Sequence, residues 1–200
     1  MKKYQIIYAD PPWSYGSRKL NASTGGKEIT DHYPTMEIED IKKLPIKELA
    51  DKNCLLFMWV VYPLLDKAFE VIKSWGFKYS TVAFEWLKMT PNGKNVCFMG
   101  AWTCGGGIEL CLLAKRGTIK RITKNVRKMV IDVRQEHSKK PDEVRKRIVE
   151  LVGDLPRIEL FTRPDKQKNL FGFDRFDNWD VWGNEVKSDI KLCPPNPKAD

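Results

Sequence analysis

The chain has 200 residues, of which 42% are hydrophobic, a length that suffices for one domain with a sizeable core. No stretch reaches the roughly 18 to 20 apolar residues of a membrane helix, and the Met-Lys-Lys start leads into a strand pattern instead of a signal peptide. We therefore expect a soluble, cytoplasmic protein. Five cysteines without a Cys-x-x-Cys pair and only two histidines favour neither a disulfide framework nor a metal site.

The net charge of +9 points to a polyanionic partner. Between Lys115 and Lys140, ten Lys or Arg stand against Asp132 and Glu136, so this segment alone carries +8 (10 − 2). We expect a basic loop over residues 115–140, with Arg134 as a candidate substrate-binding residue. A solvated charged loop and a surface that contacts phosphates both fit this segment.

The first predicted strand is the apolar run from Ile6 to Ala9, which is typical of a buried strand in a parallel sheet. Pro11 and Pro12 end it because neither can donate a hydrogen bond to a neighbouring strand. Asp10 is then expected where open α/β sheets bind ligands. We expect the two proline carbonyls to lack a local amide donor, so that they, Asp10 and the ring of Trp13 suit a planar base with an exocyclic amine. A plain turn would also explain the two prolines.

A polar stretch rich in Gly, Ser, Thr and Asn follows at residues 14–35. A loop of this length inside a domain is typically a lid or binding loop, or is disordered. Because it leaves directly from Trp13, we favour a lid.

The rest of the chain alternates strand and helix patterns. We predict, in order, a short helical segment at 37–50 broken at Pro45, a strand at 54–61, a helix from Pro63 to Trp75 stopped by Gly76, strands at 77–87 and 109–115, a helix at 141–152 and a strand at 157–163. Three consecutive glycines at 105–107 follow no strand-to-helix turn and have no Lys-Ser/Thr partner, so they do not form a phosphate loop. We expect close backbone approach or a flexible turn there.

Four segments, in the same order, resemble the MT-A family of S-adenosylmethionine-dependent N6-adenine methyltransferases. The first is Asp10-Pro-Pro-Trp13, which is similar to the family signature. The others are the Lys-Pro-Asp-Glu element that begins at Lys140, the Glu-Leu-Phe-x-Arg strand from Glu159 to Arg163, and the Trp-Asp-x-Trp-Gly-Asn-Glu element that ends at Glu185. A Trp-Thr turn before Glu109 also fits the family pattern.

The resemblance implies an α/β, Rossmann-like class I methyltransferase fold over a single domain at 1–200, with a mixed, mostly parallel sheet flanked by helices. The order of the chain would be permuted, with the catalytic half first. The implied catalytic residues are Asp10, Pro11, Pro12 and Trp13, and the implied substrate-binding residues are Tyr33 and Lys140. S-adenosylmethionine would be held by Asp10, Lys140, Glu159, Arg163, Asn184 and Glu185. Residues 164–177 form a longer connection than the family usually has, and the glycine run is a second departure.

The function implied by the resemblance is methyl transfer to the N6 amine of adenine in nucleic acid. We favour DNA because the chain is small and lacks the extra domains expected of an RNA-writing subunit. The alternatives are an RNA adenine methyltransferase, a catalytically weak nucleic-acid-binding subunit, or a methyltransferase acting on a cytosine amine or a glutamine amide. A homodimer or a partner subunit and a bacterial or phage-infected host cell fit the same resemblance.

Overall fold

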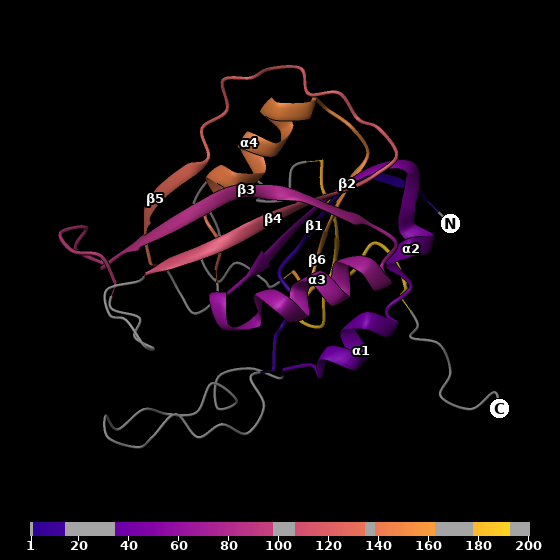
Figure 1. Cartoon of the computed structure of the whole chain (residues 1–200), viewed down its shortest axis with the longest axis horizontal. Coiled ribbons are helices and arrows are strands. Elements are labelled where there is room, and N and C mark those ends of the chain that lie inside the picture. Colours follow the sequence, from indigo (N-terminus) through magenta and orange to yellow (C-terminus); the bar gives the residue numbers. More distant parts are fainter. Residues whose placement is uncertain (1, 15–34, 98–106, 135–138, 163–177, 193–200) are drawn as a thin grey trace.

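A computed structural model describes residues 2–14, 35–97, 107–134, 139–162 and 178–192. It shows a seven-stranded sheet with helices on both faces (Figure 1). The strands are β1 (Tyr4–Ala9), β2 (Ala50–Val60), β3 (Lys78–Met89), β4 (Ile108–Arg116), β5 (Met129–Val133), β6 (Arg157–Leu160) and β7 (Asp180–Trp182). The helices are α1 (Ile38–Lys43), α2 (Ile46–Leu49), the 3₁₀ turn η2 (Tyr62–Leu64), α3 (Leu65–Ser74) and α4 (Asp142–Val152). None of the described helices is long and apolar enough to cross a membrane.

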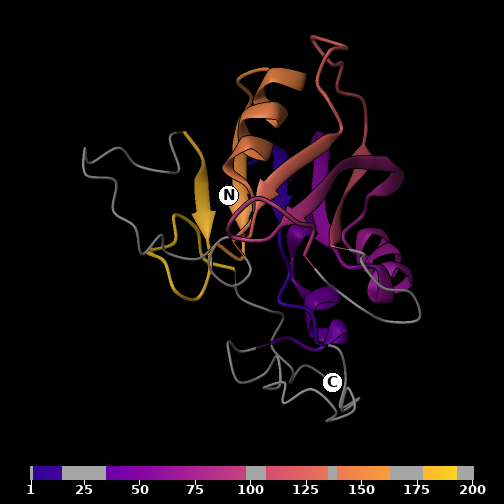
Figure 2. The same ribbon diagram turned by 90° about the vertical axis from the view of Figure 1, so that its left-hand side faces the viewer.

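The strand order is β5-β3-β4-β2-β1-β6-β7, so β1 lies inside the sheet between β2 and β6. In Figure 2 the yellow β7 stands at one end of the sheet, beside the orange β6. Among the strands of the described residues, only β4 is antiparallel to its neighbours. The carboxyl ends of the other six strands therefore lie on one side of the sheet, where β4 begins. We call this side, which is formed by strand ends and not by an outermost strand, the Asp10 edge. The opposite edge, where β4 ends, is the Arg116 edge.

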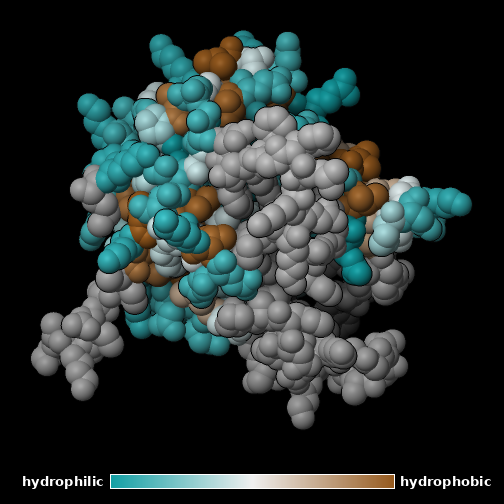
Figure 3. Space-filling view, turned by 180° about the vertical axis from the view of Figure 1, so that it is seen from behind, coloured by the Kyte–Doolittle hydropathy of each residue, from teal (hydrophilic) through white to brown (hydrophobic). Residues whose placement is uncertain are grey.

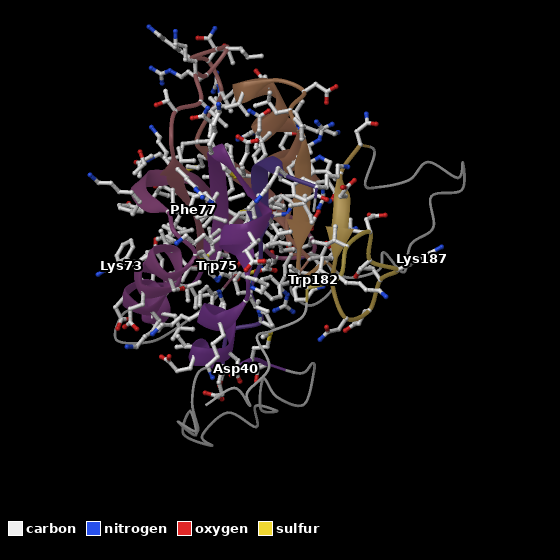
Figure 4. The ribbon with its side chains drawn as sticks, turned by 90° about the vertical axis from the view of Figure 1, so that its right-hand side faces the viewer. Asp40, Lys73, Trp75, Phe77, Trp182 and Lys187 are labelled. Atoms are coloured by element: carbon white, nitrogen blue, oxygen red, sulfur yellow. The ribbon has the colours of Figure 1, made fainter. Side chains whose placement is uncertain are left out.

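The core has two layers, because successive side chains of a strand point to opposite faces of the sheet. On one face Tyr8 and its neighbours pack against Ile148 of α4. On the other face Ile7 and its neighbours pack against α1, α2 and α3. Trp75, which follows α3, donates its indole N–H to the Ile41 carbonyl of α1 over 2.9 Å. Figure 4 shows its ring directed inward while Lys73 points outward, so these two helices form one layer.

Most predicted elements are confirmed, including the first strand, the strand at 54–61, which overlaps β2 up to Val60, and the two long helices. Gly76 has a φ of 81°, as expected for a residue that stops a helix. The last predicted strand is shorter than expected because Phe161 adopts a φ of 64°, which ends β6 at Leu160. The predicted lid falls mostly on residues 15–34, which lie outside the described residues.

The basic segment at 115–140 is not a loop throughout. Residues 115 and 116 complete β4, and Met129–Val133 form β5, which pairs in parallel with β3. The alternation of exposed Met129, buried Val130 and exposed Ile131 is a strand pattern. The density of charge on both sides concealed this pattern in the sequence.

The basic segment also does not lie wholly beside Asp10. Because β4 is antiparallel, the segment starts at the Arg116 edge, where Arg116 donates to the Lys47 carbonyl over 2.7 Å. The chain then arches over α4 (Figure 1), and the Ile122 N–H donates to the Leu151 carbonyl over 2.9 Å. Of its described residues, the end of β5, Arg134 and Lys140 lie at the Asp10 edge.

Gly117, at the start of this arch, provides a test of the close packing at the Arg116 edge. Its φ is 63°, and an added Cβ would lie 2.3 Å from the Lys52 carbonyl oxygen. Gly93 has a similar φ of 69° but has nothing within 4 Å of an added Cβ. Both Ala variants incur left-handed strain, so we expect Gly117→Ala to lower the free energy of unfolding by about 1 to 3 kcal/mol more than Gly93→Ala. Urea unfolding measures the difference, and equal losses would contradict the close approach.

Candidate active site

β1 brings Asp10 to the carboxyl edge of the sheet. Its last residue, Ala9, lies opposite Met58 of β2 and Leu160 of β6, so the strand is paired on both sides up to its end. The Asp10 N–H then donates to the Leu160 carbonyl over 3.5 Å, and Pro11 ends the ladder. The predicted strand that ends at a carboxylate is confirmed.

Asp10 belongs to a cluster of four charged side chains on the α4 face, which we call the four-charge cluster. The Lys140 ammonium lies 2.7 Å from Asp10 Oδ2 and 3.2 Å from Glu109 Oε2. Glu109 in turn accepts a hydrogen bond from Lys88. Lys140 and Glu109 are each only 8% exposed, so their charges are stabilised by one another and not by hydration.

Aromatic rings lie beneath the two cations. The Lys140 ammonium is 5.6 Å from the centroid of the Trp59 ring, and that of Lys88 is 4.8 Å from the ring of Trp86. The two indoles meet edge to face with their centroids 6.3 Å apart. Trp59 is fixed further because its N–H donates to the Tyr8 hydroxyl over 2.6 Å. Cation–π attraction therefore adds to the ion pairs in holding both lysines.

The pKa values of the buried pair follow from this arrangement. Burial lowers the pKa of the Lys140 ammonium, but the charges of Asp10 and Glu109 outweigh it and raise that pKa above its ordinary value. Burial raises the pKa of the Glu109 carboxyl, but Lys140 and Lys88 outweigh it and hold that pKa below its usual value. Both groups are therefore charged at neutral pH.

The expectation that the proline carbonyls lack a local amide donor is wrong for Pro11, whereas the donor to the Pro12 carbonyl comes from a distant residue. The Pro11 carbonyl accepts from the Trp13 N–H over 2.9 Å, and the Pro12 carbonyl accepts from the Met36 N–H over 2.8 Å. Met36, beyond the predicted lid, supplies a donor that local sequence does not show. Trp13 is only 5% exposed, and its indole N–H donates to the Trp59 carbonyl over 3.0 Å. Trp13 thus anchors the chain after β1, and its stacking on a base stays a prediction.

The chains that leave the parallel strands β6 and β7 approach each other closely at the same edge, and we call this close approach the β6–β7 crossing. The Thr162 N–H donates to the Trp182 carbonyl over 3.0 Å, and an added Cβ on Gly183 would lie 2.1 Å from the Thr162 carbonyl oxygen. Only glycine allows this approach. The left-handed Phe161 makes the turn into the crossing, and its ring packs edge to face on Trp182, with centroids 5.3 Å apart.

Asn184 and Glu185 follow the crossing directly, and both are exposed. Within the part of the chain that the structure describes, neither side chain has a hydrogen-bond partner. A carboxamide and a carboxylate are thus presented together beyond β7, where they can bind the hydroxyl groups of a ligand.

Comparison with known proteins identifies the family. The MT-A70 family model matches residues 4–185, which include both the Asp10 motif and the β6–β7 crossing. The chain belongs to the MT-A70 family.

Relatives of the MT-A70 family differ greatly in length. The Type II methyltransferase M.MunI of Mycoplasma sp is 34% identical over 100% of this chain and 84% of its own length. The human N(6)-adenosine-methyltransferase catalytic subunit METTL3 is 26% identical over 97% of this chain but only 30% of its own. The mouse N(6)-adenine-specific methyltransferase METTL4 is 27% identical over 92% of this chain and 38% of its own. The chain thus spans about a third of the length of these animal relatives.

Membership in the MT-A70 family confirms that the protein is a methyltransferase and that its reaction is methyl transfer to the N6 amine of adenine in nucleic acid. The predicted class I-like fold with a mixed, mostly parallel sheet is also confirmed. The predicted permuted order is visible in the sheet, since β1 with Asp10 comes first in the chain and lies beside β6.

The structure places the remaining predicted site residues in different surroundings. The Glu159 carboxylate accepts a hydrogen bond from Arg145 of α4 over 2.7 Å, so its visible contact is with the helix and its role toward the cofactor stays a prediction. Arg134 is exposed at the Asp10 edge, where its backbone N–H donates to the Met89 carbonyl over 2.8 Å. Tyr33 and Arg163 lie outside the described residues.

Lys88 was missed as a site residue, and Glu109 was recognised only as part of a family pattern. The available signal was a charge at the end of one apolar strand and at the start of the next. Lys88 and Glu109 meet because β3 and β4 are antiparallel, and the Lys88 N–H donates to the Gly107 carbonyl over 2.7 Å. An added Cβ on Gly107 would lie 2.6 Å from the Cys97 carbonyl oxygen, which confirms close backbone approach at this glycine.

Glu109→Gln tests the buried charges through stability. The variant leaves Lys88 without its carboxylate, and we expect it to lower the free energy of unfolding at pH 7 by about 3 kcal/mol, the low end for a broken buried pair, because Lys140 keeps Asp10. The pKa of Glu109 is lower in the folded state, so its contribution is complete above about pH 4.5 and is lost as the pH falls through the folded value. Urea unfolding at decreasing pH should show the two proteins converging.

The matched control for this measurement is Glu39→Gln. Glu39 pairs with Lys42 on the exposed surface of α1, so its loss should change stability by less than about 1 kcal/mol. A loss of unfolding free energy in Glu109→Gln that is no larger than in Glu39→Gln, or that is independent of pH, would contradict the mutual stabilisation of the buried charges.

Proposed function

We propose that the protein transfers the methyl group of S-adenosylmethionine to the N6 amine of adenine in DNA. The observation that carries the proposal is the Asp10 carboxylate at the end of β1, held by buried Lys140 at the same edge as the β6–β7 crossing. Support for DNA comes from the Type II methyltransferase relative, which matches the whole of this chain and most of its own length.

Asp10 would accept a hydrogen bond from the adenine amine. That amine is a poor nucleophile because its lone pair is delocalised into the ring, and hydrogen bonds from its protons would favour a more pyramidal nitrogen. The Pro11 carbonyl already accepts the Trp13 N–H, but a carbonyl oxygen has two lone pairs and can accept the second amine proton. Catalysis by this chain is then mostly orientation and electrostatics, with no need for full proton removal by Asp10 before transfer.

Lys140 would keep Asp10 anionic and oriented, so that it acts only as an acceptor. Glu109 and Lys88 would in turn hold Lys140 in place, since the four charges balance. A base in duplex DNA must leave the stack to reach Asp10, and stacking on Trp13 or Tyr33 would offset part of the cost.

The exposed side chains after the β6–β7 crossing fit the proposed cofactor. By family resemblance, Asn184 and Glu185 would hold the ribose and adenine edges of the cofactor, and Arg163 would bind its ribose hydroxyls. The glycine at 183 lets two backbones converge there. S-adenosylmethionine, when bound, supplies an electrophilic methyl group on a positively charged sulfur.

Incubation with labelled S-adenosylmethionine and matched DNA and RNA oligomers tests this proposal. We expect label on the N6 position of adenine in DNA. Label only in RNA would replace DNA by the alternative substrate. A protein that binds nucleic acid but transfers no label would be the binding subunit considered above.

Asp10→Asn tests the role of the carboxylate. The amide keeps the size of the side chain but loses the charge and one acceptor, so we expect kcat to fall about 100-fold or more. Calorimetry should still detect S-adenosylmethionine binding. Asp40→Asn, on the exposed surface of α1, is the control and should keep full activity. Normal kcat in Asp10→Asn would remove Asp10 from the chemistry.

A further inference from the structure

A second charged surface lies away from Asp10, on residues 117–128, which we call the far loop. It contains five cations and no acid: Lys120, Arg121, Lys124, Arg127 and Lys128. All five are exposed. Among the described residues only Lys128 reaches a carboxylate, that of Glu85 at 3.7 Å. Four positive charges of the far loop are therefore unbalanced.

The opposite layer of the molecule shows what a merely solvated charged surface looks like in this protein. On α1 and α3 three of the four lysines pair with acids. The pairs are Lys42 with Glu39 at 2.9 Å, Lys43 with Asp40 at 3.3 Å and Lys67 with Glu70 at 2.8 Å. The far loop differs from this pattern, so solubility alone does not account for its composition.

The backbone of the far loop is fixed. The Thr118 N–H donates to the Asn53 side chain over 2.9 Å, and the Arg127 carbonyl accepts from Arg147 of α4 over 2.9 Å. Ile119 and Val126 pack against the core. The loop therefore presents its cations from a preorganised frame, which reduces the entropy lost on binding a partner.

The cations of this surface point outward. In Figure 4 several side chains at the upper left of the view end in blue nitrogen atoms directed away from the molecule. Figure 3 shows that hydrophilic side chains also predominate at this upper end when the molecule is seen from behind. A row of phosphates is the partner that matches fixed, unbalanced cations.

We infer that the far loop binds the phosphate backbone of duplex DNA on one side of the target adenine. This inference rests on the proposed DNA substrate. β4 connects the two places, from Glu109 in the charged cluster to Arg116 beside the far loop. Seven residue steps of about 3.4 Å give about 24 Å. That length corresponds to about 7 base pairs at 3.4 Å each.

The geometry has two consequences for the substrate. A duplex that extends less than about 7 base pairs from the adenine on that side cannot reach the far loop. Contacts with phosphates carry no sequence information, so the far loop adds affinity without choosing the recognition sequence. Arg134, at the Asp10 edge, lies nearer the target base.

The test compares two triple variants with the same net charge. The first, Lys120→Gln with Arg121→Gln and Lys124→Gln, neutralises the far loop. The control, Lys43→Gln with Lys67→Gln and Lys73→Gln, neutralises three lysines on the α1 and α3 layer. Each lowers the net charge from +9 to +6 (9 − 3). Both are assayed for methyl transfer to duplexes whose target adenine has flanks of 3 or 15 base pairs on either side.

We expect the far-loop variant to raise KM about 10-fold on the duplex with the long flank on the contacted side, with kcat unchanged. Its slope of log K against log salt should become shallower by about 2 to 3, since three phosphate contacts are lost. On the duplex with short flanks, wild type and variant should agree. The control should match wild type throughout.

Three results would overturn the inference. They are equal effects of the two variants, an effect of the far-loop variant that does not depend on flank length, and an effect on kcat alone. A wild-type protein that labels neither DNA nor RNA would instead overturn the proposed function. Label in RNA alone would remove duplex DNA as the partner of this surface.

Discussion

The contact between Lys140 and Asp10 is the constraint on which the rest of the site depends. A buried ammonium is costly unless carboxylates compensate it, and here Asp10 and Glu109 do so from two different strands. Lys88 then balances the second carboxylate. The ends of β1 and β3, the start of β4 and the segment that leads into α4 are therefore held together by charge, and the rings of Trp59 and Trp86 beneath the cations help to fix them.

Local patterns predicted the parts of this arrangement that depend on local physics. The apolar run before Asp10, the apolar run in β2 and the glycine stop at Gly76 each carry their reason within a few residues. The family motifs predicted that Asp10 and the residues up to Glu185 belong to one site. What could not be predicted depends on distant partners: Met36 satisfies the Pro12 carbonyl, and Lys88 enters the site only because β3 and β4 are antiparallel. β5 was hidden by the charges around it.

The reversed strand β4 also separates two kinds of positive charge. It begins at the Asp10 edge with Glu109 and ends at the opposite edge with Arg116. Lys88 and Lys140 at the first edge are largely shielded from water and paired with acids, whereas the lysines of the far loop are exposed and mostly unpaired. A single count of net charge over 115–140 combined these populations, and only the topology of the sheet distinguishes them.

The neutrality of the four-charge cluster has a consequence for how a substrate arrives. Two carboxylates and two ammonium groups in contact produce a field that falls off steeply, so the cluster does little to attract a polyanion from a distance. Long-range steering comes instead from the unbalanced cations outside it. Counter-ions in solution screen those exposed charges far more than the buried ones. In the proposed mechanism, ionic strength would thus act on the encounter between enzyme and substrate, while the alignment of the acceptor amine by Asp10 would be insulated from it.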